Sequence, residues 1–162
     1  MPDFLIELLN FMSTEFKVIF TAALPIIEVR GAIPVGIALG MTPIHATLIA
    51  FIGSMIPVPF ILFSIRPIFN YLKTIRTFKK MIHKLTNKSM AKSGNVLKYG
   101  YWGLFLFVAI PLPGTGVWSG SLIASLLDMR FKYAFPTILL GNLIASIAIM
   151  ILSFGFVAAF GG

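Results

Sequence analysis

The sequence predicts an all-α integral membrane protein, and its composition is the first reason. Of its 162 residues, 58% are hydrophobic and only 11% are charged, whereas a soluble domain carries about a quarter charged residues. A mean hydropathy of +0.97 describes more apolar surface than a soluble core of this size would bury. The length suits a single membrane domain, residues 1–162, with about four embedded segments of about 20 residues each.

The distribution of charge is the second reason. Nine of the thirteen Lys and Arg residues lie between Arg66 and Lys98, in one polar stretch between apolar blocks. The positive-inside rule places such a stretch in the cytoplasm, so we expect a multi-pass protein of the inner (plasma) membrane. The same clustering argues against a nucleic-acid partner, despite the net charge of +8.

The residue types also argue against an enzyme. The chain has no cysteine, its two histidines are far apart, and no nucleotide-binding, zinc or hydrolase motif is present. We therefore expect no catalytic residue, no metal site and no cofactor.

Hydropathy and helix-breaking residues divide the chain into six segments. They are an interfacial helix at 1–15, a broken apolar segment at 16–41, a transmembrane helix at 44–65, a basic cytoplasmic loop with an amphipathic helix at 66–99, a second broken apolar segment at 101–128 and a second transmembrane helix at 132–160.

The order of these segments predicts an internal repeat, the third reason for this fold. In each half a broken segment precedes an uninterrupted one, Pro25 precedes Pro111 by 86 positions, and Gly53 precedes Gly141 by 88. Two half-helices of about 10 residues rise about 15 Å each, enough to reach the membrane midplane and return. We therefore expect two inverted repeats, each a re-entrant helical hairpin plus one transmembrane helix.

Four complete crossings are the alternative arrangement. That topology would leave Arg130 and Lys132 outside, whereas re-entrant hairpins place both on the cytoplasmic side with the basic loop. The difference rests on only two residues.

Charged residues inside the first broken segment identify a candidate site. Glu28 and Arg30 lie between Pro25 and Pro34, and unpaired charges in hydrocarbon cost several kcal/mol. Broken helices that carry charge at membrane depth are typical of transporters. With the two hairpin tips facing each other, the predicted substrate- or ion-binding residues are Glu28, Arg30, Gly31, Pro34, Pro111, Pro113, Gly114, Thr115, Gly116 and Ser119.

A second group is assigned to gating or to support of the site: Asp128, Arg130, Asn142 and Trp118. Each candidate also has a structural interpretation. Glu28 and Arg30 could form an ion pair that pins the tip, because positions two apart meet where a helix is unwound. Trp118 fits a packing aromatic, Asn142 an interhelical contact, and Asp128 and Arg130 a solvated membrane edge.

Two stretches resemble the small multi-drug export protein family of bacteria and archaea: residues 25–40 (PIIEVRGAIPVGIALG) and 111–124 (PLPGTGVWSGSLIA). That family is distantly similar to the DedA/VTT (SNARE-associated) membrane proteins, whose fold has two facing re-entrant hairpins. The DedA group is implicated in moving lipids and lipid carriers, and the resemblance assigns its acidic residue to Glu28 and an arginine to Arg130. The spacing of basic residues here departs from the DedA pattern.

The function expected is a small transporter, such as an antiporter coupled to protons or another ion, that moves a small amphipathic or anionic substrate through a midplane site. The alternatives are a DedA-like lipid or lipid-carrier flippase or scramblase, and a non-transporting membrane scaffold. Expected partners are membrane lipids, with anionic headgroups at residues 66–98, protons as coupling ion, and further copies of the chain in a homo-oligomer.

Overall fold

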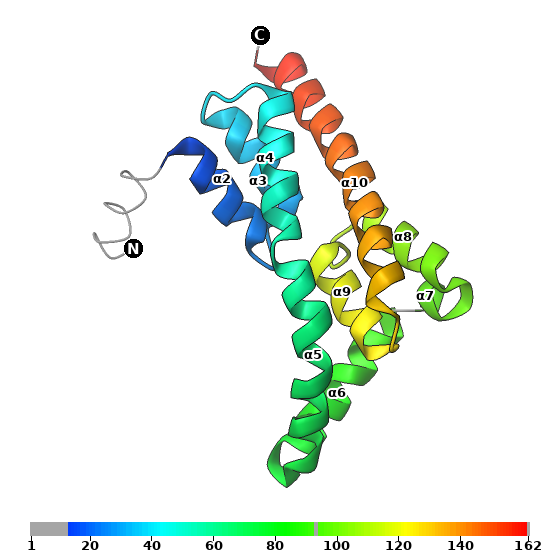
Figure 1. The fold of residues 1–162 in the computed structure, drawn as a ribbon. Helices are drawn as coiled ribbons and strands as arrows, with labels where there is room; N and C mark the ends of the chain where they lie inside the picture. Colours follow the sequence, from blue (N-terminus) through cyan, green and yellow to red (C-terminus); the bar gives the residue numbers. More distant parts are fainter. Residues whose placement is uncertain (1–12, 93, 162) are drawn as a thin grey trace. The chain divides into compact units, whose positions relative to one another are not determined.

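The computed structural model describes residues 13–92 and 94–161, and all the regular structure in these ranges is helical (Figure 1). This confirms the all-α prediction for the described residues. The interfacial helix predicted at 1–15 lies almost wholly outside them. In chain order the helices are α2 (Thr14–Ala23), α3 (Glu28–Ala38), α4 (Pro43–Met55), α5 (Pro57–Thr74), α6 (Arg76–Lys92), α7 (Gly94–Tyr99), α8 (Tyr101–Ala109), α9 (Val117–Leu126) and α10 (Phe131–Phe160).

Two helical stretches of the described chain are long and apolar enough to cross a membrane. They are Pro43–Leu72, made of α4 and α5, and Phe131–Phe160, which is α10. Large exposed apolar residues recur along the first stretch at three- and four-residue spacing, which puts them on one face: Ile44, Leu48, Ile52, Ile56, Phe60 and Phe63. Such a stripe suits contact with lipid tails rather than water.

The first long stretch extends beyond its predicted end. Residues 66–72, expected in the basic loop, continue the helix, and the rest of that loop is helical as α6 and α7. The amphipathic helix expected through residues 66–88 is interrupted at Ile75, whose extended backbone separates α5 from α6.

The chain forms two compact units, a division that the hydropathy pattern does not predict. The first unit comprises the residues up to Ser54 and those from Ser146 onward, and the second spans Met55–Ala145. Each has its own apolar core. The first core contains Val18, Ala22, Val29, Ala32, Ile33 and Ala50, and the second contains Val58, Leu62, Val96, Leu104, Val108, Val117, Ile123, Ala124, Ala134 and Ile138.

In the first unit, small residues let α2, α3 and α4 approach closely. The chain turns between α2 and α3 over residues 24–27, and the two helices pack against each other. A Cβ atom on Gly53 of α4 would lie 2.7 Å from the carbonyl oxygen of Ile19 in α2. A Cβ on Gly36 of α3 would lie 2.9 Å from the Cβ of Ala46 in α4. Helices α2 and α4 therefore meet backbone to backbone at Gly53, while α3 and α4 approach through the small residues Gly36 and Ala46.

In the second unit, residues 101–128 fold back so that their ends meet. The backbone N–H of Arg130, beyond α9, donates a hydrogen bond to Oη of Tyr101 at the start of α8, at 3.3 Å. Helix α9 also packs against α5. A Cβ on Gly141 of α10 would lie 2.9 Å from the carbonyl oxygen of Phe105 in α8.

Local geometry recurs between the halves of the sequence at nearly fixed offsets. The long apolar stretches begin and end 88 positions apart. Gly53 meets Ile19 as Gly141 meets Phe105, and these partners lie 88 and 86 positions apart.

The ends of α3 and α9 recur in the same way. The N–H of Met41 bonds to the carbonyl of Gly36 at 3.0 Å, and that of Met129 bonds to Ala124 at 2.9 Å, again with an offset of 88. Both pairs are the six-to-one bond that closes a helix C-terminus.

A methyl group at Gly141 tests the close contact of α10 with α8. Gly141→Ala should lower stability by about 1–3 kcal/mol, because backbone and Val108 must move to admit the new Cβ. The measurement is thermal unfolding of the purified protein in detergent. The matched control is Gly155→Ala in the same helix, where nothing lies within 4 Å of the new Cβ and stability should hold or rise. Equal melting temperatures for the two variants would contradict the contact.

Candidate functional site

Glu28 is a buried carboxylate in an unusual backbone conformation. It begins α3 and is only 3% exposed. Its φ is +49°, a left-handed value that costs a residue with a side chain about 1–2 kcal/mol. The negative charge lies at a helix N-terminus, where the helix dipole favours an anion. The chain therefore keeps a strained, buried acid at a position where an apolar residue would cost less free energy.

The guanidinium of Arg30 accompanies this carboxylate. Its Nη1 lies 3.7 Å from Oε2 of Glu28, and the Arg30 side chain is 21% exposed. Positions two apart do not face each other on a regular helix, so the left-handed turn at Glu28 is what allows the pair to form. The predicted ion pair of the two charges is present, at the start of α3, while its place in a hairpin tip stays a prediction.

Glycines at the corresponding positions show what the backbone needs there. Among the described residues, Glu28 and Asp128 are the non-glycine residues with positive φ, at +49° and +55°. Gly116, 88 positions after Glu28, has a φ of +124°, and Gly40, 88 positions before Asp128, has a φ of +90°. Glycine adopts this conformation without strain. Each half of the sequence thus has an acidic residue at a positive-φ position where the other half has a glycine.

The other two residues predicted in the first segment, Gly31 and Pro34, lie in different surroundings. A Cβ on Gly31 would collide with the side chain of Ile27, so Gly31 lets the turn stay tight beneath Glu28. Pro34 is exposed within α3 and lies about 9 Å further along the helix axis. It lines an apolar groove of about 440 Å³ together with Ile37, Ala38, Leu152, Ser153, Phe156 and Val157. Pro34 follows Arg30 by one helical turn, so it is closer to Arg30 than to Glu28.

Thr115 organises the break in the second segment. Its Oγ1 lies 2.8 Å from the carbonyl oxygens of Ile110 and Leu112, and it accepts the Leu112 N–H at 3.3 Å. The hydroxyl thus forms hydrogen bonds with main-chain groups of the break, where no helix supplies a regular partner. Around it Pro111 is half-buried, Pro113 and Gly114 are exposed, and Gly116 is the buried residue that precedes α9.

Helix α9 and its neighbours carry the remaining candidates. Ser119 is half-buried in the first turn of α9. Trp118 packs against the core of the second unit, as its packing interpretation predicts. Asn142 is 2% exposed and follows the close-contact residue Gly141, which agrees with a role in helix packing.

Arg66 is a functional candidate that the sequence analysis did not select. Its Nε lies 3.0 Å from Oδ1 of Asp128, its Nη2 donates to the Met129 carbonyl at 2.8 Å, and Nε also donates to the Ser125 carbonyl at 3.3 Å. Arg66 therefore closes the C-terminus of α9 from α5. The signal is present in the sequence, because Arg66 follows a long apolar run, but its charge resembles that of the basic residues after it.

The structure groups the predicted residues into two sets. Glu28, Arg30 and Gly31 lie together in the first unit, whereas the Pro111–Ser119 residues lie in the second. The prediction that the two tips meet therefore stays a prediction.

Among the described residues, no cluster of three or more His, Asp or Glu side chains could hold a metal ion.

A comparison with family models identifies the family of the chain. The model described as "Putative small multi-drug export protein" matches residues 28–148, well over half of the chain. The matched region begins at Glu28 and includes Arg66, the Pro111–Ser119 turn and Asp128. This confirms the predicted resemblance to that family, while the more distant similarity to DedA proteins stays a prediction. No curated protein and no solved structure matches the chain.

Replacing either partner of the Arg66–Asp128 pair tests how α9 is capped. Asp128→Asn should cost less than about 1 kcal/mol, because both side chains are substantially exposed and the pair is screened. Arg66→Gln should cost more, about 1–2 kcal/mol, because it also removes donors to two carbonyls at the helix end. Thermal unfolding in detergent at low and high salt measures both losses. The reverse ranking would show that the carboxylate, not the cap, carries the contribution of Arg66.

Proposed function

Because the chain belongs to the small multi-drug export protein family, we propose that it is a small transporter coupled to protons or another ion. Its substrate is a small amphipathic or anionic molecule, and the Glu28–Arg30 pair is part of the path. The family description and two long apolar helices make the chain a membrane protein. The finer mechanism rests on the geometry of the first unit.

The observation that carries the proposal is the state of Glu28. Glu28 is costly in two separate ways, because its carboxylate is buried at 3% exposure and its backbone is left-handed, and the guanidinium of Arg30 at 3.7 Å offsets part of the burial cost. Strained buried polar residues cluster at working sites, where the surrounding fold supports them. A carboxylate that takes up and releases a proton or cation would couple ion movement to substrate movement, and Arg30 would compete for the same charge.

The recurring local geometry supports two inverted repeats. The first unit combines α2, α3 and α4 with the second part of α10, while the second unit combines α8, α9 and the first part of α10 with α5. Each unit thus contains one pair of short helices, the start of one long stretch and the end of the other. Such an exchange is what an inverted repeat would give. With one membrane crossing per half, the two halves would run in opposite directions.

Helix length supports re-entrant hairpins. Helices α2, α3, α8 and α9 have 10, 11, 9 and 10 residues. Each rises about 15 Å, half the hydrocarbon thickness. The Arg130–Tyr101 hydrogen bond brings together the two ends of residues 101–128, as expected of a re-entrant hairpin.

The basic helix α6 supports the proposed orientation and lipid partners. Arg76, Lys79, Lys80, Lys84 and Lys88 are all exposed on it. Their charge favours the cytoplasmic face of an inner membrane, next to anionic headgroups. Assembly of several copies remains part of the proposal, since a chain this small completes a pathway more easily as an oligomer.

Labelling of single cysteines tests the topology, and the cysteine-free sequence supplies a clean background. With re-entrant hairpins, cysteines at Lys98 and Arg130 should react from the same side of the membrane, and one at Thr42 from the opposite side. An impermeant maleimide applied to intact and to permeabilised cells gives the result. Labelling of positions 98 and 130 from opposite sides would establish a crossing and refute the hairpin.

Neutralising Glu28 tests the coupling. Glu28→Gln should abolish the flux of an amphipathic dye driven by a pH gradient in proteoliposomes, because the group that exchanges the coupling ion is gone. Ethidium and carboxyfluorescein serve as cationic and anionic probes. Glu15→Gln in the same unit is the matched control and should retain wild-type flux. Unchanged gradient-driven flux in Glu28→Gln would refute the coupling, and size-exclusion profiles establish that each variant is folded.

The same preparation separates the alternatives. Translocation of a fluorescent phospholipid without dye flux would favour a flippase or scramblase. For a scaffold, deletion of residues 76–92 should abolish the cellular function while Glu28→Gln preserves it. The opposite pattern is expected for the transporter.

A further inference from the structure

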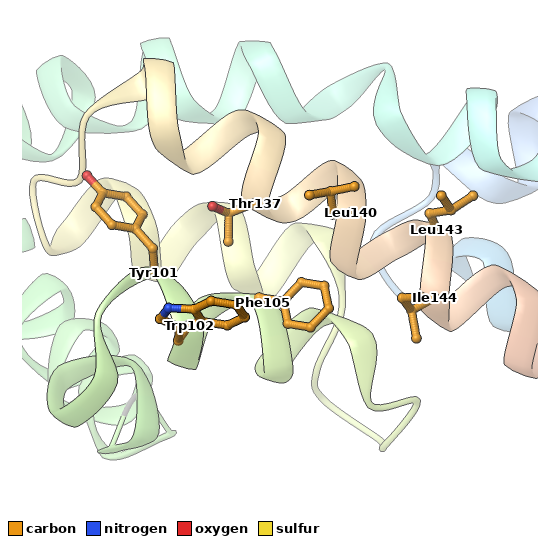
Figure 2. A pocket seen from close by; sticks show the side chains of 7 residues that line it. All are labelled: Tyr101, Trp102, Phe105, Thr137, Leu140, Leu143 and Ile144. Carbon is orange, nitrogen blue, oxygen red and sulfur yellow. The ribbon is translucent and has the colours of Figure 1, made fainter.

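A groove of the second unit has the composition of a phospholipid site. It has a volume of about 410 Å³ and lies between α8 and α10 (Figure 2). Its lining is almost entirely apolar or aromatic: Tyr101, Trp102, Phe105, Thr137, Leu140, Leu143 and Ile144. Trp102 is 76% exposed, so the groove opens outward rather than into the core.

The polar groups of the groove lie toward one end, and the opposite end is aliphatic. Figure 2 shows the Tyr101 hydroxyl at one end and the aliphatic Leu143 and Ile144 at the other. At the tyrosine end, Oη of Tyr101 accepts the N–H of Arg130 at 3.3 Å, and the Tyr101 ring lies 5.7 Å from that of Tyr133. Aromatic rings with a polar tip collect at the depth of lipid headgroups.

Cations collect at the same end. Nζ of Lys132 lies 5.9 Å from the centre of the Tyr133 ring, and Arg130 is exposed beside it. Asp128 is the only acidic residue between Met55 and Ala145, and its carboxylate is paired with Arg66. The charge here is therefore positive without local compensation, which suits an anionic headgroup and would repel the same face of a second, equally basic copy.

The length of the groove suits part of an acyl chain. From Thr137 to Ile144 the axis of α10 rises about 10 Å, which corresponds to roughly the first half of an extended fatty acyl chain. Phe105 on α8 and Leu140 on α10 face each other across it (Figure 2).

We infer that this groove holds one anionic phospholipid as a resident lipid, with an acyl chain against Trp102, Phe105 and Leu140 and the headgroup phosphate at Arg130 and Lys132. The site goes beyond the proposed transport function, since it shares no residue with the Glu28–Arg30 pair. A lipid bound there would fill the space between α8 and α10 and stabilise the close contact at Gly141.

Tryptophan fluorescence tests the site directly, because the chain has only two tryptophans, Trp102 and Trp118. In the full-length Trp118→Phe variant, Trp102 is the sole reporter. The protein is reconstituted into phosphatidylcholine vesicles with increasing amounts of phosphatidylglycerol brominated on its acyl chains. Bromine quenches only a nearby indole, so quenching of Trp102 reports occupancy of the groove, and brominated phosphatidylcholine gives the reference.

Brominated phosphatidylglycerol should bind at Trp102 more tightly than phosphatidylcholine, by about fivefold for each cation that contacts the headgroup. Arg130→Gln and Lys132→Gln should each remove about fivefold of this preference, while Lys17→Gln in the first unit leaves it intact. Thr137→Phe should reduce quenching by both lipids by filling the groove, whereas Ser153→Phe, in the groove of the first unit, should not.

Three results would overturn the inference. The first is equal quenching by the two lipids, and the second is a preference that survives both charge substitutions. The third is found if Thr137→Phe leaves quenching unchanged but changes the oligomeric mass measured by light scattering. That result would assign the groove to contact between copies of the chain. None of these readouts depends on transport, so a failure here leaves the Glu28 proposal standing.

Discussion

Polar backbone groups must find partners wherever an apolar segment stops being helical, and much of this structure serves that need. Water is scarce at membrane depth, so each unmade backbone bond is costly. At the first break the N–H of Glu28 bonds to the Leu24 carbonyl at 3.2 Å. At the second break the Thr115 hydroxyl serves the carbonyls of Ile110 and Leu112. The breaks are thus fixed turns, and fixed turns can present side chains at defined positions.

The same constraint gives meaning to the paired positions of acids and glycines. The backbone needs a left-handed residue before or after α3 and α9 to close these turns, and glycine meets that need at Gly40 and Gly116. The opposite half uses Asp128 and Glu28 instead. The ion pair between Asp128 and Arg66 at the surface offsets part of the backbone strain at Asp128. Glu28 is buried with Arg30, and the transport proposal gives a reason to keep its charge there.

The two units differ in the polarity of equivalent sequence positions. In the second unit the end of α9 is held by Arg66, with Asn70 and Ser125 alongside. The corresponding surface in the first unit is lined by Ile37, Ala38 and Val157. The Arg66 cap thus holds the end of α9 in the second unit through polar contacts, whereas the described residues at the corresponding positions of the first unit are apolar.

The sequence by itself determined the helical class, the long apolar stretches and the position of the breaks. These follow from composition, periodicity and the placement of Pro and Gly, all of which act locally. It also identified Glu28 and Arg30, because charge in an apolar run is conspicuous in any fold. The extent of α5 was less visible, since the charged residues from Arg66 onward look like a loop although the helix continues to Thr74.

Only the tertiary structure decided which residues work together. The role of Arg66 as a cap depends on Ser125 and Met129, which lie about sixty positions later and approach it only when α5 packs on α9. The positive φ of Glu28 arises from the tight turn under packed helices, and no propensity scale assigns it to a glutamate. The groove between α8 and α10 likewise exists only once Gly141 admits the backbone of Phe105. Local chemistry can be read along a chain, whereas contacts across tens of residues are set by packing.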